Sequence, residues 1–190
     1  MNLIILGPQG SGKGTQAKLL ADKYNLNHIS TGELIRQEVA SNSPFGRVLQ
    51  EKINTGELIS DSELFSVLEK TPLNQKNGFI LDGTPRNLFQ AQELEKVFKR
   101  VGVKLDKVVL LTLSHEESLN RMRKRAEIEH RTDDNDEAMQ KRLELYQNET
   151  VPVIDFYRQQ GKVIEVNGTP DIDTVFRDIV SKLEDVKYVS

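Results

Sequence analysis

A glycine-rich stretch that contains one lysine lies near the start of the chain, in the sequence GPQGSGKG at residues 7–14. Gly7, Gly12 and Lys13 keep the spacing G-x-x-x-x-G-K. Glycines allow backbone turns that a side chain would block, so successive N–H groups can point at phosphate oxygens, and a following helix N-terminus adds partial positive charge. Between a strand and a helix, this frame predicts a nucleotide-binding loop whose lysine reaches the outer phosphates. The alternative is a plain glycine-rich turn.

The residue after the lysine is Gly14, where many such loops carry a Ser or Thr whose hydroxyl binds Mg²⁺. Thr15 offers a hydroxyl one residue later, which can bond a phosphate but is displaced from that metal position. We therefore expect no side chain to bind the metal directly. Mg²⁺ is expected to be held by nucleotide phosphates and water, with Asp82 close enough to bind it through water.

Arginine is the other residue type that indicates phosphate chemistry. A planar guanidinium binds phosphate through two parallel hydrogen bonds and does not lose its charge, which suits a site that holds several phosphates. The alternative is a solvated helix face with glutamates at i,i+4, which we favour for Arg123. The candidates follow expected strands or lie between residues 120 and 143: Arg36, Arg86, Arg121, Arg125, Arg131 and Arg142.

Short apolar runs alternate with segments of helical periodicity, which predicts an α/β fold of three layers with a five-stranded parallel sheet. The expected strands are Leu3–Leu6, His28–Ser30, Phe79–Leu81, Val108–Leu113 and Val163–Val166. The expected helices are Gln16–Tyr24, Leu88–Val101, Glu116–Arg125, Glu137–Arg158 and Thr174–Leu183. Because ligands of such sheets bind at the carboxyl ends of strands, the loops after the first three strands are expected to meet in one site.

Composition limits the class of protein. The 190 residues suit one domain, and 37% apolar with 29% charged residues is typical of a soluble globular chain without a membrane span. No export signal is recognisable, so we expect a cytoplasmic protein. The absence of cysteine excludes disulfides and cysteine-bound zinc, and a net charge of −3 gives no general attraction for nucleic acid.

Several motifs resemble those of one family in order and approximate spacing. They are GPQGSGKGTQ, STGELIRQE, GELISD, LDGTPRN with QA at residues 90–91, RMRKR, RTDD and KRL. Across residues 1 to about 180 the chain resembles adenylate kinases of the short-lid type. The resemblance implies the P-loop nucleoside monophosphate kinase fold, as one core domain over residues 1–190 with two mobile inserts. Residues 30–59 would close over AMP, and residues 126–136 would form a short lid over ATP.

The implied activity is reversible phosphoryl transfer from ATP, with Mg²⁺, to AMP, giving two ADP, in a protein that we expect to be a monomer. The residues implied to bind ATP are Gly10, Ser11, Gly12, Lys13, Gly14, Thr15, Arg121, Arg125 and Pro170. Those implied to bind AMP are Thr31, Arg36, Glu57, Leu58, Ile59, Gly83, Thr84, Pro85, Arg86, Gln90, Arg131 and Arg142. Catalysis is assigned to Lys13, Arg86, Arg121, Arg125, Arg131 and Arg142.

Two departures from the family pattern carry expectations. Thr84 stands where relatives usually have Phe, and we expect weaker AMP binding from the lost aromatic packing. The lid sequence AEIEH at residues 126–130 lacks the usual glycines, so we expect a stiffer lid and slower closure.

Two other functions remain open at this stage. Asn87 directly after the DGTPR turn is favoured by pyrimidine (UMP/CMP) monophosphate kinases, whereas Thr31 and Gln90 favour AMP. A non-catalytic adenylate-binding module is the second alternative, but mere binding does not require Lys13 and so many arginines around the transferred group.

Overall fold

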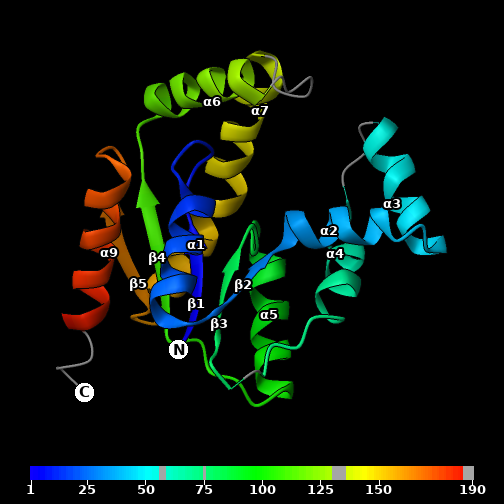
Figure 1. Ribbon diagram of the computed structural model, residues 1–190, viewed down its shortest axis with the longest axis horizontal. Helices are drawn as coiled ribbons and strands as arrows, with labels where there is room; N and C mark the ends of the chain where they lie inside the picture. The colour runs from blue at the N-terminus through cyan, green and yellow to red at the C-terminus, as the bar shows by residue number, and fades with distance from the viewer. Residues whose placement is uncertain (56–58, 75, 130–135, 186–190) are drawn as a thin grey trace.

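A five-stranded parallel sheet forms the centre of the molecule. The computed structural model describes residues 1–55, 59–74, 76–129 and 136–185. The strands are β1 (Asn2–Leu6), β2 (Asn27–Ser30), β3 (Phe79–Asp82), β4 (Lys107–Thr112) and β5 (Val163–Asn167), in the spatial order β2-β3-β1-β4-β5 (Figure 1). All four strand pairings are parallel. The predicted sheet is confirmed, with each strand within a residue of its expected bounds.

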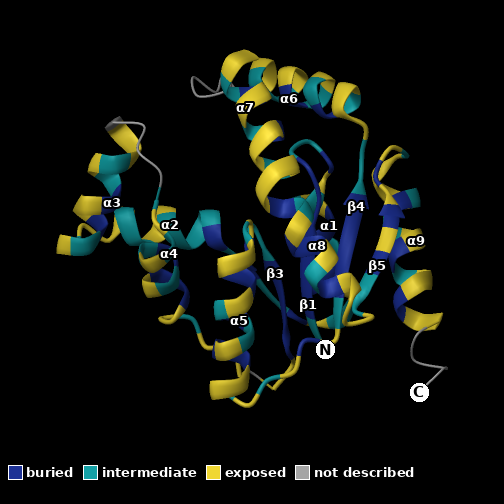
Figure 2. Ribbon diagram, turned by 180° about the vertical axis from the view of Figure 1, so that it is seen from behind, coloured by how far each residue is buried: buried dark blue, intermediate teal, exposed yellow. Residues whose placement is uncertain are grey.

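Helices cover both faces of the sheet, because successive residues of a strand point to opposite faces. On one face Ile4 and Leu6 pack with buried residues of α5 (Leu88–Arg100) and α8 (Val151–Arg158). On the other face Leu3 and Ile5 pack with α1 (Lys13–Tyr24) and α9 (Ile172–Asp185). The strands are buried between these two layers, whose outer surfaces are exposed (Figure 2). This is the expected three-layer α/β architecture.

A group of three helices between β2 and β3 projects away from the sheet (Figure 1). They are α2 (Thr31–Ala40), α3 (Pro44–Thr55) and α4 (Asp61–Leu68), and α2 packs against both of the others. Gly46 of α3 lies so close to the Glu38 carbonyl of α2 that a Cβ would collide with it. The insert predicted over residues 30–59 thus corresponds mainly to α2 and α3; its motion over a ligand stays a prediction.

The helix expected over Glu137–Arg158 is a composite. It consists of α7 (Asp136–Leu145), a π-helical turn η1 (Tyr146–Thr150) and α8. The N–H of Val151 donates to the carbonyl of Tyr146, five residues earlier, as a π turn requires. The next residue, Pro152, has no N–H to continue the α-helical bonding at this point. Apolar periodicity alone does not reveal this widened turn.

Helix α6 (His115–Glu129) ends four residues after the expected Arg125. Ala126 packs partly buried against Met122 and Met139, so the first residues of the expected lid are helical. The remainder of that lid, residues 130–135, lies outside the described residues. Within the described part of the chain, no helix is long and apolar enough to span a bilayer.

Candidate active site

The glycine-rich loop runs from the end of β1 into the start of α1, as the sequence predicts. Gly10 and Gly12 have φ angles of 79° and 86°, which disfavour other residues. A Cβ on Gly10 would also lie 3.1 Å from the Cβ of Arg121 on α6, so the loop packs closely under that helix. The sharp turns let the loop present backbone N–H groups at the N-terminus of α1, which is an arrangement suited to anions.

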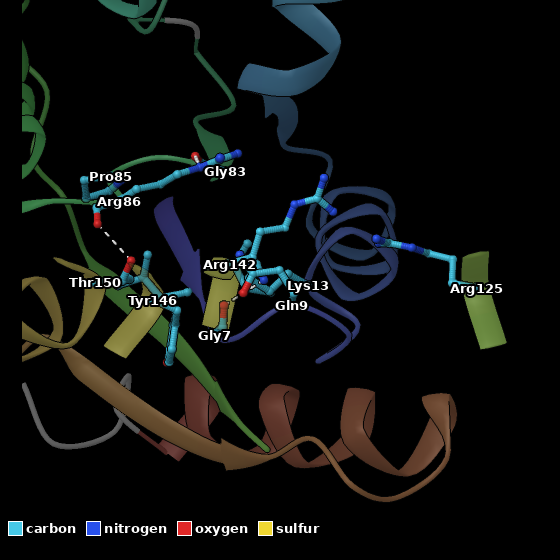
Figure 3. A pocket seen from close by; sticks show the side chains of 12 residues that line it. Gly7, Gln9, Lys13, Gly83, Pro85, Arg86, Arg125, Arg142, Tyr146 and Thr150 are labelled. Carbon is cyan, nitrogen blue, oxygen red and sulfur yellow. Dashed lines mark hydrogen bonds between the residues drawn. The ribbon is translucent and has the colours of Figure 1, made fainter. Parts of the chain in front are cut away.

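Lys13 folds back over this loop. Its Nζ donates a hydrogen bond to the carbonyl oxygen of Gly7 at 2.7 Å (Figure 3) and another to that of Pro8 at 2.9 Å. The pKa of Lys13 is lowered to about 8, mainly by burial and also by the charges of Arg86 and Arg125, while Asp82 acts in the opposite direction. The ammonium therefore lies in surroundings that favour its neutral form, which a bound polyphosphate would reverse.

Two cavities meet at the loop. The first, of about 320 Å³, lies beside Arg86, Arg142 and Tyr146, while the second, of about 660 Å³, extends over Gly14 and Thr15. Three residues line both cavities: Gln9, Lys13 and Arg125. The two hollows are therefore adjacent, and their common wall carries two cations.

Four cationic side chains line the first cavity: Lys13 from α1, Arg86 from the turn after β3, Arg125 from α6 and Arg142 from α7 (Figure 3). They come from four separate parts of the chain. Such a cluster of positive charge is unfavourable in the absence of anions, because like charges repel at short range. Its presence indicates a site for a highly charged anionic ligand.

The turn after β3 holds Arg86 at the edge of this cavity. Gly83 has a φ of 89° and lies against Thr31, whose Oγ1 would lie 2.6 Å from a Cβ on that glycine. Thr84 and Pro85 are joined by a cis peptide bond. The Nε of Arg86 donates to the Gly83 carbonyl at 2.7 Å, which directs the guanidinium along the turn.

Other predicted arginines also border the cavities. Arg36 lines the second cavity together with Arg121 and Arg125. All three nitrogens of the Arg121 guanidinium donate within the protein: Nε to Glu117, Nη1 to the Gly168 carbonyl and Nη2 to the Thr169 carbonyl. Arg121 therefore ties α6 to the loop after β5, and its predicted role toward ATP stays a prediction.

Several predicted binding residues do not line either cavity. Ser11, Thr31, Thr84 and Gln90 are buried, and Ile59 and Pro170 lie outside both linings. The Thr84 hydroxyl donates to Gln90 Oε1 at 3.1 Å, so its side chain contacts another residue of the protein and does not face a cavity. Predicted contacts of Glu57, Leu58 and Arg131 fall outside the described residues.

Gln90 holds the turn through both ends of its carboxamide. Oε1 accepts from the N–H of Arg86 at 2.7 Å, and Nε2 donates to Asp61 at 2.6 Å. Asn87 caps α5 by accepting from the N–H of Gln90, and its Nδ2 donates to Asp61. The Asn87 side chain, which raised the pyrimidine alternative, is therefore engaged inside the protein.

Asp82 lies beside Gly14, as the magnesium hypothesis requires. A Cβ at Gly14 would be 3.4 Å from Asp82 Oδ2, and His28 Nε2 lies 3.8 Å from the same oxygen. The described residues contain no group of three or more His, Cys, Asp or Glu side chains that could hold a metal ion. A single carboxylate beside a phosphate loop fits an Mg²⁺ held mainly by phosphates and water.

The structure adds lining residues that sequence reasoning did not identify. Gln9, Tyr146 and Thr150 line the first cavity, and Lys18 and His28 line the second. Burial raises the pKa of Tyr146 to about 12, so its hydroxyl stays neutral. The spacing 142, 146, 150 is a weak sequence signal for the first cavity's helical residues, because each four-residue step keeps only approximately to one helix face.

Comparisons with known proteins agree with this arrangement. A family model described as adenylate kinase matches residues 5–162. The chain is 46% identical over 181 residues to an adenylate kinase of Xanthomonas campestris pv. campestris (strain B100), covering 94% of this chain and 97% of that protein. An adenylate kinase of Xanthomonas euvesicatoria pv. vesicatoria is 46% identical over 186 residues, covering 96% and 99%.

A more distant relative gives the same result: an adenylate kinase of Prochlorococcus marinus (strain NATL1A) is 41% identical over 181 residues, covering 95% of this chain and 97% of that protein. Similarity on this scale extends through the glycine-rich loop, the turn after β3 and the composite helix. The expected family is thereby confirmed, and the chain belongs to the adenylate kinases, with their P-loop nucleoside monophosphate kinase fold.

Proposed function

We propose that this chain transfers a phosphoryl group reversibly from ATP to AMP and so forms two ADP. The observation that carries the proposal is the common wall of the two cavities, because Lys13 and Arg125 border both of them. A site for one nucleotide needs cations on one side only. Cations between two adjacent hollows suit a phosphoryl group that passes from one ligand to the other.

In this reaction an oxygen of the AMP phosphate forms a bond to the γ-phosphorus of ATP. The bond from that phosphorus to the bridging oxygen breaks, and the bridging oxygen remains on ADP. The protein's task is to hold donor and acceptor in line, neutralise the equatorial oxygens and exclude water. We assign the neutralisation to Lys13, Arg86, Arg125 and Arg142, which line the first cavity.

We place the ATP phosphates on the glycine-rich loop and the AMP phosphate near Arg86. Support for the first placement comes from Gly10, Gly12 and Thr15, which line the second cavity beside the α1 N-terminus. Support for the second comes from Arg86 and Arg142, which line the first cavity and are absent from the lining of the second. Arg36 lines the second cavity, and we propose that it meets AMP after the α2–α3 insert closes.

Mg²⁺ is the cofactor that this proposal includes. When bound, it would neutralise charge on the β- and γ-phosphates, and Asp82 is the carboxylate that would hold it through water. The working form is proposed to be a cytoplasmic monomer, with ATP, AMP and ADP as its partners.

A coupled assay tests the function directly. Purified protein with ATP, Mg²⁺ and AMP should form ADP, and CMP or UMP in place of AMP should give much lower kcat/KM. ADP formation no faster than without enzyme would support the non-catalytic module instead. Preference for CMP or UMP would support the pyrimidine kinase, although the internal bonds of Asn87 argue against that reading.

A further inference from the structure

The peptide groups on both sides of Arg86 are held by side chains from two different elements. Its N–H donates to Gln90 Oε1 on α5 at 2.7 Å. Its carbonyl accepts a hydrogen bond of 2.8 Å from the hydroxyl of Thr150, on the π turn η1, 64 positions later in the chain (Figure 3). Thr150 is buried, with 8% of its surface exposed, so water has little access to replace this bond.

The Arg86 side chain is exposed at the cavity edge, so its position depends on the backbone that carries it. Its Nε donates to the Gly83 carbonyl within the same turn, and the nearby charge of Asp82 attracts the guanidinium. Binding phosphate with a residue on a loose turn would cost backbone entropy as well as side-chain rotamers. A fixed backbone on both sides of Arg86 removes the backbone part of that cost before the ligand arrives.

The π turn explains why Thr150 faces Arg86. In an α-helix a step of four residues exceeds one turn of about 3.6 residues, so each such step rotates the side chain by about 40°. A π turn holds more residues per turn, so the same step falls short of a full circle and rotates the side chain back. The step from Arg142 to Tyr146 lies mainly in α7, and the step from Tyr146 to Thr150 lies in η1.

The two rotations oppose each other, so Arg142, Tyr146 and Thr150 all line the first cavity. With an uninterrupted α-helix, Thr150 would be rotated away from Arg142 by two steps of the same sign. The π turn thus allows one composite helix, α7–η1–α8, to carry both Arg142, which lines the cavity, and Thr150, which binds the Arg86 carbonyl.

We propose that Thr150, which the π turn places on the same side as Arg142, is a positioning residue for Arg86. The inference rests on the proposed function, because it takes Arg86 as the group that binds the acceptor phosphate. Thr150 acts through the Arg86 backbone and thereby sets where the guanidinium lies relative to Arg142.

The decisive variant is Thr150→Val, which keeps the side chain's shape and removes its hydroxyl. Losing one hydrogen bond of ordinary strength should raise KM for AMP by about 3- to 10-fold and leave KM for ATP unchanged. Thr150→Ser restores the hydroxyl and should return KM for AMP to within about twofold of the original value. The melting temperature is measured for each variant, so that stability and positioning are separated.

Thr112→Val is the matched control. The Thr112 hydroxyl also donates to a backbone carbonyl, that of Val166 on β5 at 3.3 Å, and β1 separates its strand β4 from β3, which leads into the Arg86 turn. This variant should leave KM for AMP unchanged even if the melting temperature falls.

The proposal is overturned if Thr150→Val lowers the melting temperature but leaves KM for AMP within twofold, or if KM rises equally for both nucleotides. Failure of Thr150→Ser to restore KM would also overturn it. Failure of the proposed function looks different: the unmodified protein would then form no ADP from ATP and AMP, before any variant is compared.

Discussion

Lys13 is a cationic residue in a buried position, where its charged form is disfavoured. Burial lowers its pKa to about 8, and its ammonium is held by the carbonyls of Gly7 and Pro8. Since a depressed lysine pKa means that the unfolded chain binds the proton more tightly, this group's contribution to stability rises as the pH increases from 8 to 10.5.

The same depressed pKa predicts proton uptake when ATP binds. At pH 8.5 about half or more of the Lys13 side chains are neutral, and polyphosphate beside the amine raises its pKa, so binding should take up protons. Calorimetric titration of ATP in buffers of different ionisation enthalpy measures the number of protons taken up on binding. The uptake should vanish at pH 6.5 and in Lys13→Met, which should also lose most of kcat. Equal uptake in Lys13→Met would assign the proton to another group.

Thr84 illustrates how a residue can be identified correctly and interpreted incompletely. The sequence singles it out as a departure from the family, with weaker AMP binding as the expected result. In the structure it is fully buried and donates to Gln90. The expected effect on AMP stays a prediction, but its route would run through Gln90 and the Arg86 N–H, not through direct contact.

At the scale of elements, the packing of α2 against α3 depends on Gly46. A Cβ there would collide with the Glu38 carbonyl, and backbone cannot give way as a flexible side chain can. Gly46→Ala should therefore separate the two helices, lower the melting temperature and raise KM for AMP more than KM for ATP. Val48→Ala, an exposed position on the same helix, is the control and should change neither. An unchanged melting temperature in Gly46→Ala would contradict this account of the contact.

The last turn of α6 includes the first residues of the expected lid. The expected lid begins with Ala126, yet residues up to Glu129 are helical, because alanine and glutamate are good helix formers. Glu127→Gly should unwind this last turn at a cost of about 1 kcal/mol and raise kcat, if a stiff lid limits closure. Glu127→Ala removes the same charge and keeps the helix. Equal kcat values in the two variants would show that stiffness is not limiting.

Sequence patterns identify elements well where one periodicity governs a segment. Buried parallel strands such as Val108–Leu111 are continuous apolar runs, so strand positions follow directly. The π turn was missed because a one-residue widening leaves apolar spacing nearly unchanged over Glu137–Arg158. Likewise, Arg86 and Lys13 are recognisable from their motifs, whereas the roles of Thr150 and Asp61 depend on contacts between distant segments that no local pattern contains.

At the scale of the whole molecule, the sheet order β2-β3-β1-β4-β5 places β1 between β3 and β4. The glycine-rich loop therefore has the Arg86 turn on one side and α6 on the other. This arrangement predicts that a ligand that fills both cavities stabilises the fold more than a ligand that fills only one of them. A ligand at 100 times its Kd raises the free energy of unfolding by about 2.7 kcal/mol.

A dinucleotide that joins two adenosines through a long polyphosphate should thus raise the melting temperature more than ATP or AMP at equal concentration. Thermal unfolding with each ligand measures the difference, and Arg86→Ala should reduce the dinucleotide's advantage more than the effect of ATP alone. Equal shifts for ATP and the dinucleotide would mean that only one cavity is a nucleotide site.

Because the two cavities share a wall, a ligand in one cavity should change the affinity of the other cavity for its ligand. Lys13 and Arg125 border both hollows, so phosphates in one change the electrostatic potential in the other. Thermodynamic linkage then requires that any factor by which ATP changes the affinity for AMP is the factor by which AMP changes the affinity for ATP. A neutral residue at Arg125 should alter this coupling as well as each affinity, so communication between the substrates is a property of the active site itself.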